Sequence, residues 1–207
     1  MEKHPEYLKD LTEIRTMMER STKFLSLTGM SGIMAGVYAL IGAYLANRYF
    51  YSELELESYQ SYAGNFSGDF VNLIYLAAAI VVLTVGTAII LSYRKAAKNG
   101  QMLWNSAARR LLINMLIPLA TGGLLILILL SKGFAGLAAP LTLIFYGLAL
   151  VNASKFSYDE FKYLGLIEIA LGLIAVFFIG YGLLFWAIGF GVMHIIYGIY
   201  MHLIFEK

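Results

Sequence analysis

The sequence predicts an all-α polytopic membrane protein, a bundle of six transmembrane helices with both ends of the chain in the cytoplasm. Three observations lead to this prediction. The 207 residues are 60% hydrophobic and only 14% charged, whereas soluble domains carry about 25% charged residues. The charges are clustered, which leaves long apolar stretches between them. The positive charges also fall into alternate connections, which indicates how the chain is threaded.

The apolar stretches are long enough to cross a bilayer, because about 18 or more apolar residues in a helix span a ~30 Å hydrocarbon core. The last stretch is about twice that length, and Gly180-Tyr181-Gly182 divides it near its middle. We therefore expect one membrane domain over residues 1–207, with spans at about 24–47, 70–93, 111–131, 133–153, 163–180 and 183–204.

Two segments outside the spans are long enough to have a predicted structure. In residues 5–22, Tyr7, Leu11, Ile14 and Met18 recur at helical spacing, which predicts an amphipathic helix. This helix would lie on the inner membrane face or under the bundle, or form a short seam that pairs subunits. Residues 48–69 are expected to form an outer loop.

The distribution of cations sets the predicted orientation. Only Arg48 and Lys132 lie in the connections assigned to the outside, whereas the other 13 of the 15 Lys and Arg residues lie on the opposite side. Positive residues are retained on the cytoplasmic side of a membrane. The N-terminus and the C-terminus are therefore predicted to be inside, in a multi-pass protein of a cell membrane, such as a bacterial inner membrane.

Spans three and four share a pattern with spans five and six. Tyr146-Gly147 near the end of one pair corresponds to Tyr197-Gly198 near the end of the other, and a glycine-punctuated helix precedes each. This pattern predicts tandem two-helix hairpins. Glycines at helical spacing also let helices approach closely, which allows a homo-oligomer.

The region Leu111–Phe205 resembles the small HdeD-like acid-resistance membrane proteins, on the strength of Gly172, Gly189, Tyr197 and Gly198. The resemblance implies helical hairpins and no established catalytic site. The amphipathic N-terminal segment and the long outer loop depart from that family.

Ionisable groups within spans are costly in lipid and indicate functional sites. Glu168 and His194 each lie thirteen residues from Tyr181, the centre of the outer turn. They should therefore be at equal depth on adjacent helices, ~20 Å from the turn at ~1.5 Å per residue. The pair is interpreted as a structural polar contact, a proton or ion site, or two ligands of a metal. His202 would lie nearer the cytoplasm and face another direction.

A second polar position follows from a proline. Pro118 cannot donate a hydrogen bond, so the carbonyl of Asn114 loses its helical partner. Asn114 therefore joins Glu168, His194 and His202 as a candidate intramembrane polar site.

The sequence contains none of the common hydrolase, metalloprotease or nucleotide-binding motifs, and it has no cysteine. No catalytic, cofactor-binding or metal-binding residue is predicted. The basic connection 94–110 suits anionic lipid headgroups better than nucleic acid. We therefore expect a non-enzymatic integral membrane protein with a structural, stress-linked or sensing role that acts through assembly or a partner. The alternative is a small transporter or channel for protons or a small solute that uses Glu168 and His194.

Overall fold

The computed structural model describes residue 24 and residues 27–51, 68–100 and 102–205. The described chain is all α-helical, which confirms the predicted class. The predicted amphipathic helix 5–22 and residues 52–67 of the predicted outer loop lie outside the described residues.

The helices follow one another along the chain with short connections. They are α2 (Gly29–Ala46), η1 (Asn47–Tyr51), α3 (Gly68–Lys98), α4 (Ser106–Ser131), η3 (Ala135–Leu137), α5 (Ala138–Ala153), η4 (Ser154–Phe156), α6 (Glu160–Phe177), η5 (Ile179–Tyr181), α7 (Gly182–Trp186), η6 (Ala187–Met193) and α8 (His194–Phe205). Segments η1 and η6 are π-helical, and η3, η4 and η5 are short 3₁₀ turns.

Some helices extend beyond the predicted spans, because a cap rather than the last charge decides where a helix begins or ends. Helix α4 starts at Ser106 instead of near 111, since the side chain of Asn105 accepts a 2.8 Å hydrogen bond from the backbone N–H of Ala108. Such a cap satisfies one of the free N–H groups of the first turn. The charged residues Arg109 and Arg110 therefore lie inside the helix.

Five segments of the described chain are long and apolar enough to cross a membrane: Gly29–Tyr49, Val71–Lys98, Ser106–Ser131, Ala135–Phe156 and Ile179–Phe205. Large apolar side chains are exposed on their outer faces, for example Val82 (70% exposed) and Ile117 (61% exposed). An apolar exterior of this extent matches a lipid environment. The chain is thus a multi-pass α-helical membrane protein that contacts the bilayer.

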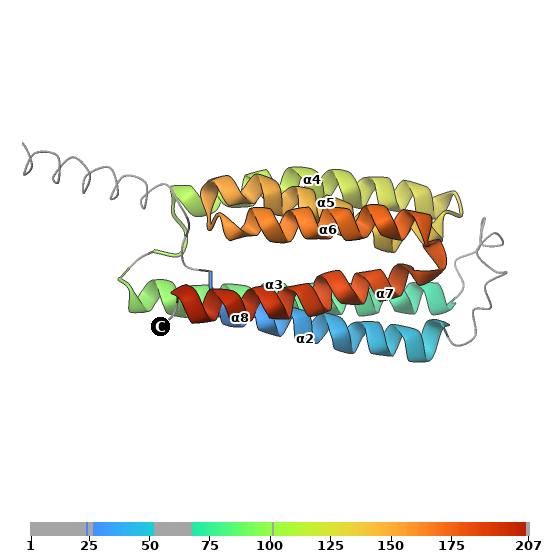
Figure 1. The fold of residues 1–207 in the computed structure, drawn as a ribbon, viewed down its shortest axis with the longest axis horizontal. Helices are drawn as coiled ribbons and strands as arrows, with labels where there is room; N and C mark the ends of the chain where they lie inside the picture. The colour runs from blue at the N-terminus through green and yellow to red at the C-terminus, as the bar shows by residue number, and fades with distance from the viewer. Residues whose placement is uncertain (1–23, 25–26, 52–67, 101, 206–207) are drawn as a thin grey trace, which may run out of the picture.

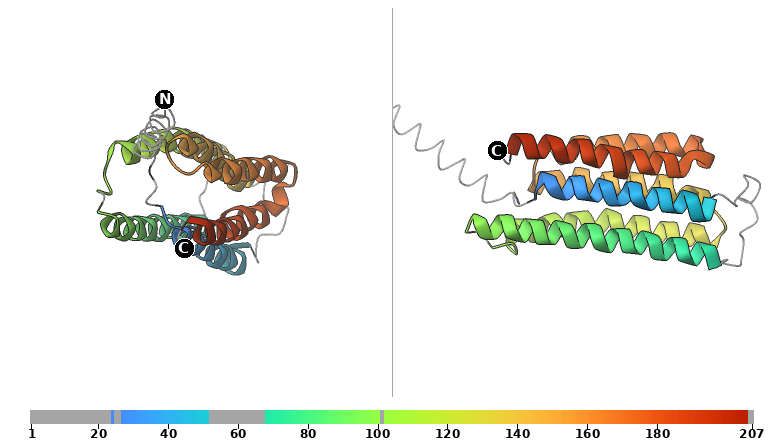
Figure 2. Two further views of the ribbon diagram at one scale, coloured as in Figure 1. Left: turned by 60° about the vertical axis from the view of Figure 1, so that its left-hand side comes forward. Right: turned by 90° about the horizontal axis from the view of Figure 1, so that it is seen from below.

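The helices form two layers (Figure 1). Helices α4, α5 and α6 make one layer, in which α5 packs against both neighbours, and α2 packs against both α3 and α8 in the other. Seen from below in the right panel of Figure 2, the second layer runs α8, α2, α3, with α6, α5 and α4 behind in the same order. The layers are joined chiefly where α7 and η6 contact α5 and α6.

This arrangement separates the two helices of the last predicted hairpin. Helix α6 packs most extensively against α5, whereas α8 packs most extensively against α2. The chain crosses from one layer to the other at the turn after α6, which Figure 2 shows at the edge of the molecule. Residues on α6 and α8 that face each other therefore lie between the layers.

Close helix contacts within each layer occur at glycines. A methyl group on Gly147 of α5 would come within 2.5 Å of the Gly165 carbonyl oxygen on α6. A methyl group on Gly198 of α8 would come within 2.6 Å of the Gly29 carbonyl oxygen on α2. These two contacts, named here the glycine seams, bring backbones together as in other membrane helix pairs.

At one end of the bundle the two layers are also held by the chain that precedes α2. The backbone N–H of Phe24 donates to the Phe156 carbonyl at 2.7 Å, and the Ser157 hydroxyl donates to the Phe24 carbonyl at 2.9 Å. The Lys95 Nζ donates to the Leu27 carbonyl at 2.8 Å. Because Arg94, Lys95, Lys98, Arg109, Arg110, Lys155 and Lys162 lie in the helix ends and turns here, we name it the basic end.

Candidate functional site

Glu168 lies on the packed face of α6, and its side chain has no exposed surface (0%). The buried residues of this helix are Leu164, Gly165, Glu168, Gly172 and Ala175, at the spacing of one helix face. The small residues of this stripe fit against α5, and the carboxyl group is carried into the interior with them. Burying a carboxyl group is costly unless it is neutral or paired.

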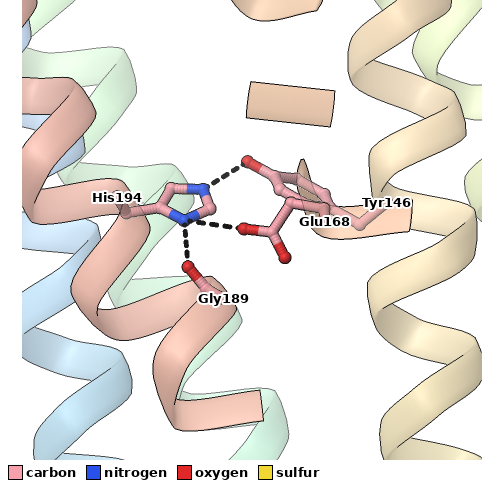
Figure 3. A network of polar contacts seen from close by, with 4 residues as sticks. All are labelled: Tyr146, Glu168, Gly189 and His194. Carbon is pink, nitrogen blue, oxygen red and sulfur yellow. Dashed lines mark hydrogen bonds and ion pairs between the residues drawn. The ribbon is translucent and has the colours of Figure 1, made fainter. Parts of the chain in front are cut away.

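His194, the first residue of α8, provides the neighbour of this carboxyl group and is 6% exposed. Its Nδ1 lies 3.4 Å from Glu168 Oε1 and 3.0 Å from the carbonyl oxygen of Gly189. Its Nε2 lies 2.8 Å from the hydroxyl of Tyr146 on α5. Figure 3 shows Glu168 and Tyr146 approaching the imidazole from one side, while Gly189 belongs to the same helical segment as the histidine. We name these four residues the polar junction.

The local backbone explains why both groups can meet. The segment before His194 is π-helical over Ala187–Met193, and such segments occur often at functional sites. A methyl group on Gly189 would collide with Glu168 Oε2 and come within 2.6 Å of Leu143 Cδ2. A larger residue at this position would force the Glu168 carboxyl group and the Leu143 side chain to shift.

The hydrogen-bond partners fix one proton of the imidazole. The Gly189 carbonyl can only accept, so Nδ1 carries a hydrogen and donates to it. In the neutral imidazole, Nε2 then accepts from the Tyr146 hydroxyl, and in the imidazolium Nε2 donates to the Tyr146 oxygen. Tyr146 can therefore serve both protonation states without moving.

The carboxyl group is less well satisfied. The 3.4 Å separation from His194 Nδ1 exceeds the usual 2.7–3.2 Å of an N–H···O hydrogen bond. Within the described residues, neither oxygen of Glu168 has a hydrogen-bond partner, and the Tyr197 hydroxyl has none either. The pair has zero net charge as carboxylate with imidazolium or as carboxylic acid with imidazole. A further proton or the loss of one leaves a buried net charge, which is costly.

The two other predicted polar residues lie elsewhere. The side chain of His202 is exposed, and its backbone packs against Gly29 of α2. The Asn114 side chain donates to the Arg110 carbonyl of its own helix at 2.8 Å. Its own carbonyl, which Pro118 leaves without a helical donor, accepts from Asn152 Nδ2 of α5 at 3.5 Å. The free carbonyl of Asn114 is thus satisfied by a hydrogen bond between α4 and α5.

Sequence reasoning missed three members of this region. Tyr146 and Tyr197 occupy matching places in the Tyr-Gly pattern of the two hairpins, and Gly189 belongs to a glycine-rich stretch. The repeated Tyr-Gly pair was a usable signal, because each glycine lies in a glycine seam while Tyr146 reaches the polar junction. The close contacts at Gly189 depend on side chains of α5 and α6 and have no signal in sequence.

No group of three or more His, Cys, Asp or Glu side chains that could hold a metal occurs among the described residues. No family model, no curated protein and no solved structure matches this chain. Fold and site therefore define only a class: a multi-pass α-helical membrane protein with a buried Glu–His–Tyr junction between its two helix layers.

Proposed function

We propose that this chain is a non-enzymatic proton-responsive membrane protein in which ionisation of the polar junction changes how the two helix layers pack. The observation that carries the proposal is the place of Glu168, fully buried and 3.4 Å from His194 Nδ1, between α6 of one layer and α8 of the other. Imidazole has an unperturbed pKa of about 6.5, so small changes in proton concentration near neutrality alter its charge.

The proposal includes six spans with both termini in the cytoplasm. It counts α6 as a span, although its 18 residues include Glu160, Lys162 and Glu168. The first two lie in its first turn at the basic end, where headgroups and water would surround them. Gathering of cations at that end supports a cytoplasmic position for it. The resemblance to HdeD-like acid-resistance proteins agrees with a sensing role through assembly or a partner.

Transport of protons or a small solute is the second candidate, and the burial of Glu168 argues against it. A carrier needs its central site to communicate with both sides of the membrane. In this structure the carboxyl group has no exposed surface, and rings of Phe190 and Trp186 pack in series beyond His194. Reconstituted vesicles that carry a proton flux dependent on Glu168 would favour transport over sensing.

The test is the pH dependence of stability of the purified protein between about pH 5 and 8, the range in which histidine titrates. We expect the thermal midpoint of the unchanged protein to vary by about 3 °C or more, which corresponds to about 1 kcal/mol in a protein of this size. Glu168→Gln should flatten that profile, because without the carboxylate no counter-charge stabilises an imidazolium at His194, and the buried imidazole stays neutral across this range.

His202→Gln is the matched control, since this exposed histidine lies outside the junction and its loss should leave the profile as it was. A Glu168→Gln protein with the full pH dependence would refute the proposal. So would a His202→Gln protein that loses the dependence while Glu168→Gln retains it.

A further inference from the structure

Aromatic rings cover the polar junction on the side away from the basic end. The Phe190 ring centroid lies 4.9 Å from that of Tyr146 and 5.8 Å from that of His194. Trp186, one turn further from the basic end, packs at a tilt against Phe190, with the ring centroids 5.1 Å apart. None of these covering side chains has a group that could accept and pass on a proton at His194. The junction is closed in this direction by apolar rings.

On the side toward the basic end, a hydroxyl follows instead. Tyr197 lies one turn beyond His194 on α8, and its ring packs against Phe161 of α6 at 5.6 Å. Its hydroxyl is buried and has no hydrogen-bond partner among the described residues. Along α8, Tyr197 therefore lies between the polar junction and the basic end, with its ring against the first turn of α6.

We propose that the polar junction exchanges protons only with the basic end, through the hydroxyls of Tyr146 and Tyr197, while Phe190 and Trp186 close the opposite side. This inference rests on the proposed proton-responsive function and assigns its direction of access. The groups that can ionise along this route are Tyr146 on α5, Tyr158 in the turn before α6, Glu160 and Glu168 on α6, and His194, Tyr197 and Tyr200 on α8, with Lys95 of α3 over the Tyr158 ring. Segments α7 and η6, which pack beside them, contribute none.

The proposed route transfers one proton from the basic end to His194. Tyr146 gives its hydroxyl proton to His194 Nε2, 2.8 Å away, and the imidazole becomes imidazolium. Tyr197, whose hydroxyl has no hydrogen-bond partner in the described part of the chain, replaces the proton of Tyr146 through an intervening water molecule and takes one in turn from the aqueous side at the basic end. Both hydroxyls are restored, and one proton has entered. Transfer from Nδ1 to Glu168 Oε1 requires the 3.4 Å separation between them to shorten to hydrogen-bond distance.

Tryptophan fluorescence of the protein itself can report protonation of the polar junction. The chain contains two tryptophans, Trp104 and Trp186, so Trp104→Phe leaves only Trp186, whose ring packs against Phe190, which in turn stacks on His194. An imidazolium quenches nearby indole fluorescence. After a rapid pH change in nanodiscs, the fluorescence of Trp186 should follow protonation of the junction.

In this background Tyr197→Phe should slow the fluorescence change at least tenfold and leave its final amplitude intact, because the ring still packs but the hydroxyl is gone. Tyr163→Phe, an exposed tyrosine on α6 at the same end, should leave the rate unchanged. An unaltered rate in Tyr197→Phe overturns the route. Absence of any pH-dependent signal in the Trp104→Phe parent, with Trp186 retained, overturns the proposed function itself, so the two failures are distinguishable.

Sidedness is measured in sealed vesicles with the pH changed outside only. The chain lacks cysteine, so Asn99→Cys at the exposed basic end can be labelled to count the molecules that present this end outward. The rapidly responding fraction should equal the labelled fraction. A rapid fraction equal to the unlabelled one would place access at the opposite end and overturn the inference.

Discussion

In the pairs α5–α6 and α2–α8, helices of one layer meet backbone to backbone at glycines, whereas α6 and α8 of different layers meet through the polar side chains of Glu168 and His194. In the glycine seams, Gly147 approaches Gly165 so closely that a single methyl group would collide with a backbone carbonyl. At the polar junction, Glu168 and His194 stand 3.4 Å apart, and both carboxyl oxygens are left without a hydrogen bond in the described part of the chain. The backbone contacts in the glycine seams allow one packing arrangement of the helices. The polar junction can instead adopt several protonation states.

Under the proposed proton-responsive function, this difference would let one bundle be both stable and responsive. Close packing in lipid gains from many dispersion contacts, which do not depend on pH. The free energy of a buried acid–base pair depends strongly on how many protons it holds. Its net contribution to stability is small, since the cost of desolvation offsets the attraction between the charges. We therefore expect substitutions in the seams to destabilise the fold most, and substitutions of the ionisable junction residues to alter its pH response. The predictions below test this contrast, beginning with the largest effect.

The largest effect is expected from Gly147→Leu. Its side chain would have to occupy the space of the Gly165 carbonyl and of Ile169 on α6, and overpacking of this kind costs about 3 kcal/mol or more when backbone must move. We expect loss of a monodisperse protein in size-exclusion chromatography and a lower thermal midpoint. Gly123→Leu on α4 is the matched control, because nothing lies within 4 Å of its added Cβ. Equal damage from both would contradict the special role of the seam.

An intermediate effect is expected from Gly189→Ala, which places a methyl group against the Glu168 carboxyl group and Leu143. We expect a loss of about 1–3 kcal/mol in thermal or denaturant unfolding. Combining it with Glu168→Ala should recover part of that loss, because the shorter side chain vacates the space. Residues in contact show such non-additive effects, commonly about 0.5–3 kcal/mol. Strict additivity in this double-mutant cycle would show that the two residues do not compete for space.

The smallest effect is expected from Asn152→Leu, which removes the donor to the Asn114 carbonyl. At 3.5 Å this bond is long, and hydrogen bonds between membrane helices contribute about 0.6 kcal/mol on average. Pro118→Ala would restore the helical donor to that carbonyl, so Asn152→Leu should cost less in the alanine background. A larger loss from Asn152→Leu than from Gly189→Ala would reverse the order proposed here.

The sequence alone predicted the class of protein and the depth of the polar groups. Apolar length and clustered charge are local properties, and a rise of ~1.5 Å per residue converts position along a helix into depth. Glu168 and His194 could therefore be placed level with each other by counting from Tyr181. The loss of a donor at Pro118 follows equally from covalent structure.

Only the tertiary structure decided which way those groups face. Lipid is as apolar as the helix interfaces, so an apolar stretch gives little indication of which face is buried. The separation of α6 and α8 into different layers, the π-helical turn that directs His194 to Glu168, and the exposure of His202 all depend on packing against helices distant in sequence. Tyr146 belongs to the site for the same reason, because α5 packs against α6 and α8 lies across from both. Its hydroxyl comes within 2.8 Å of the imidazole, although an uncharged tyrosine gives no such indication in the sequence.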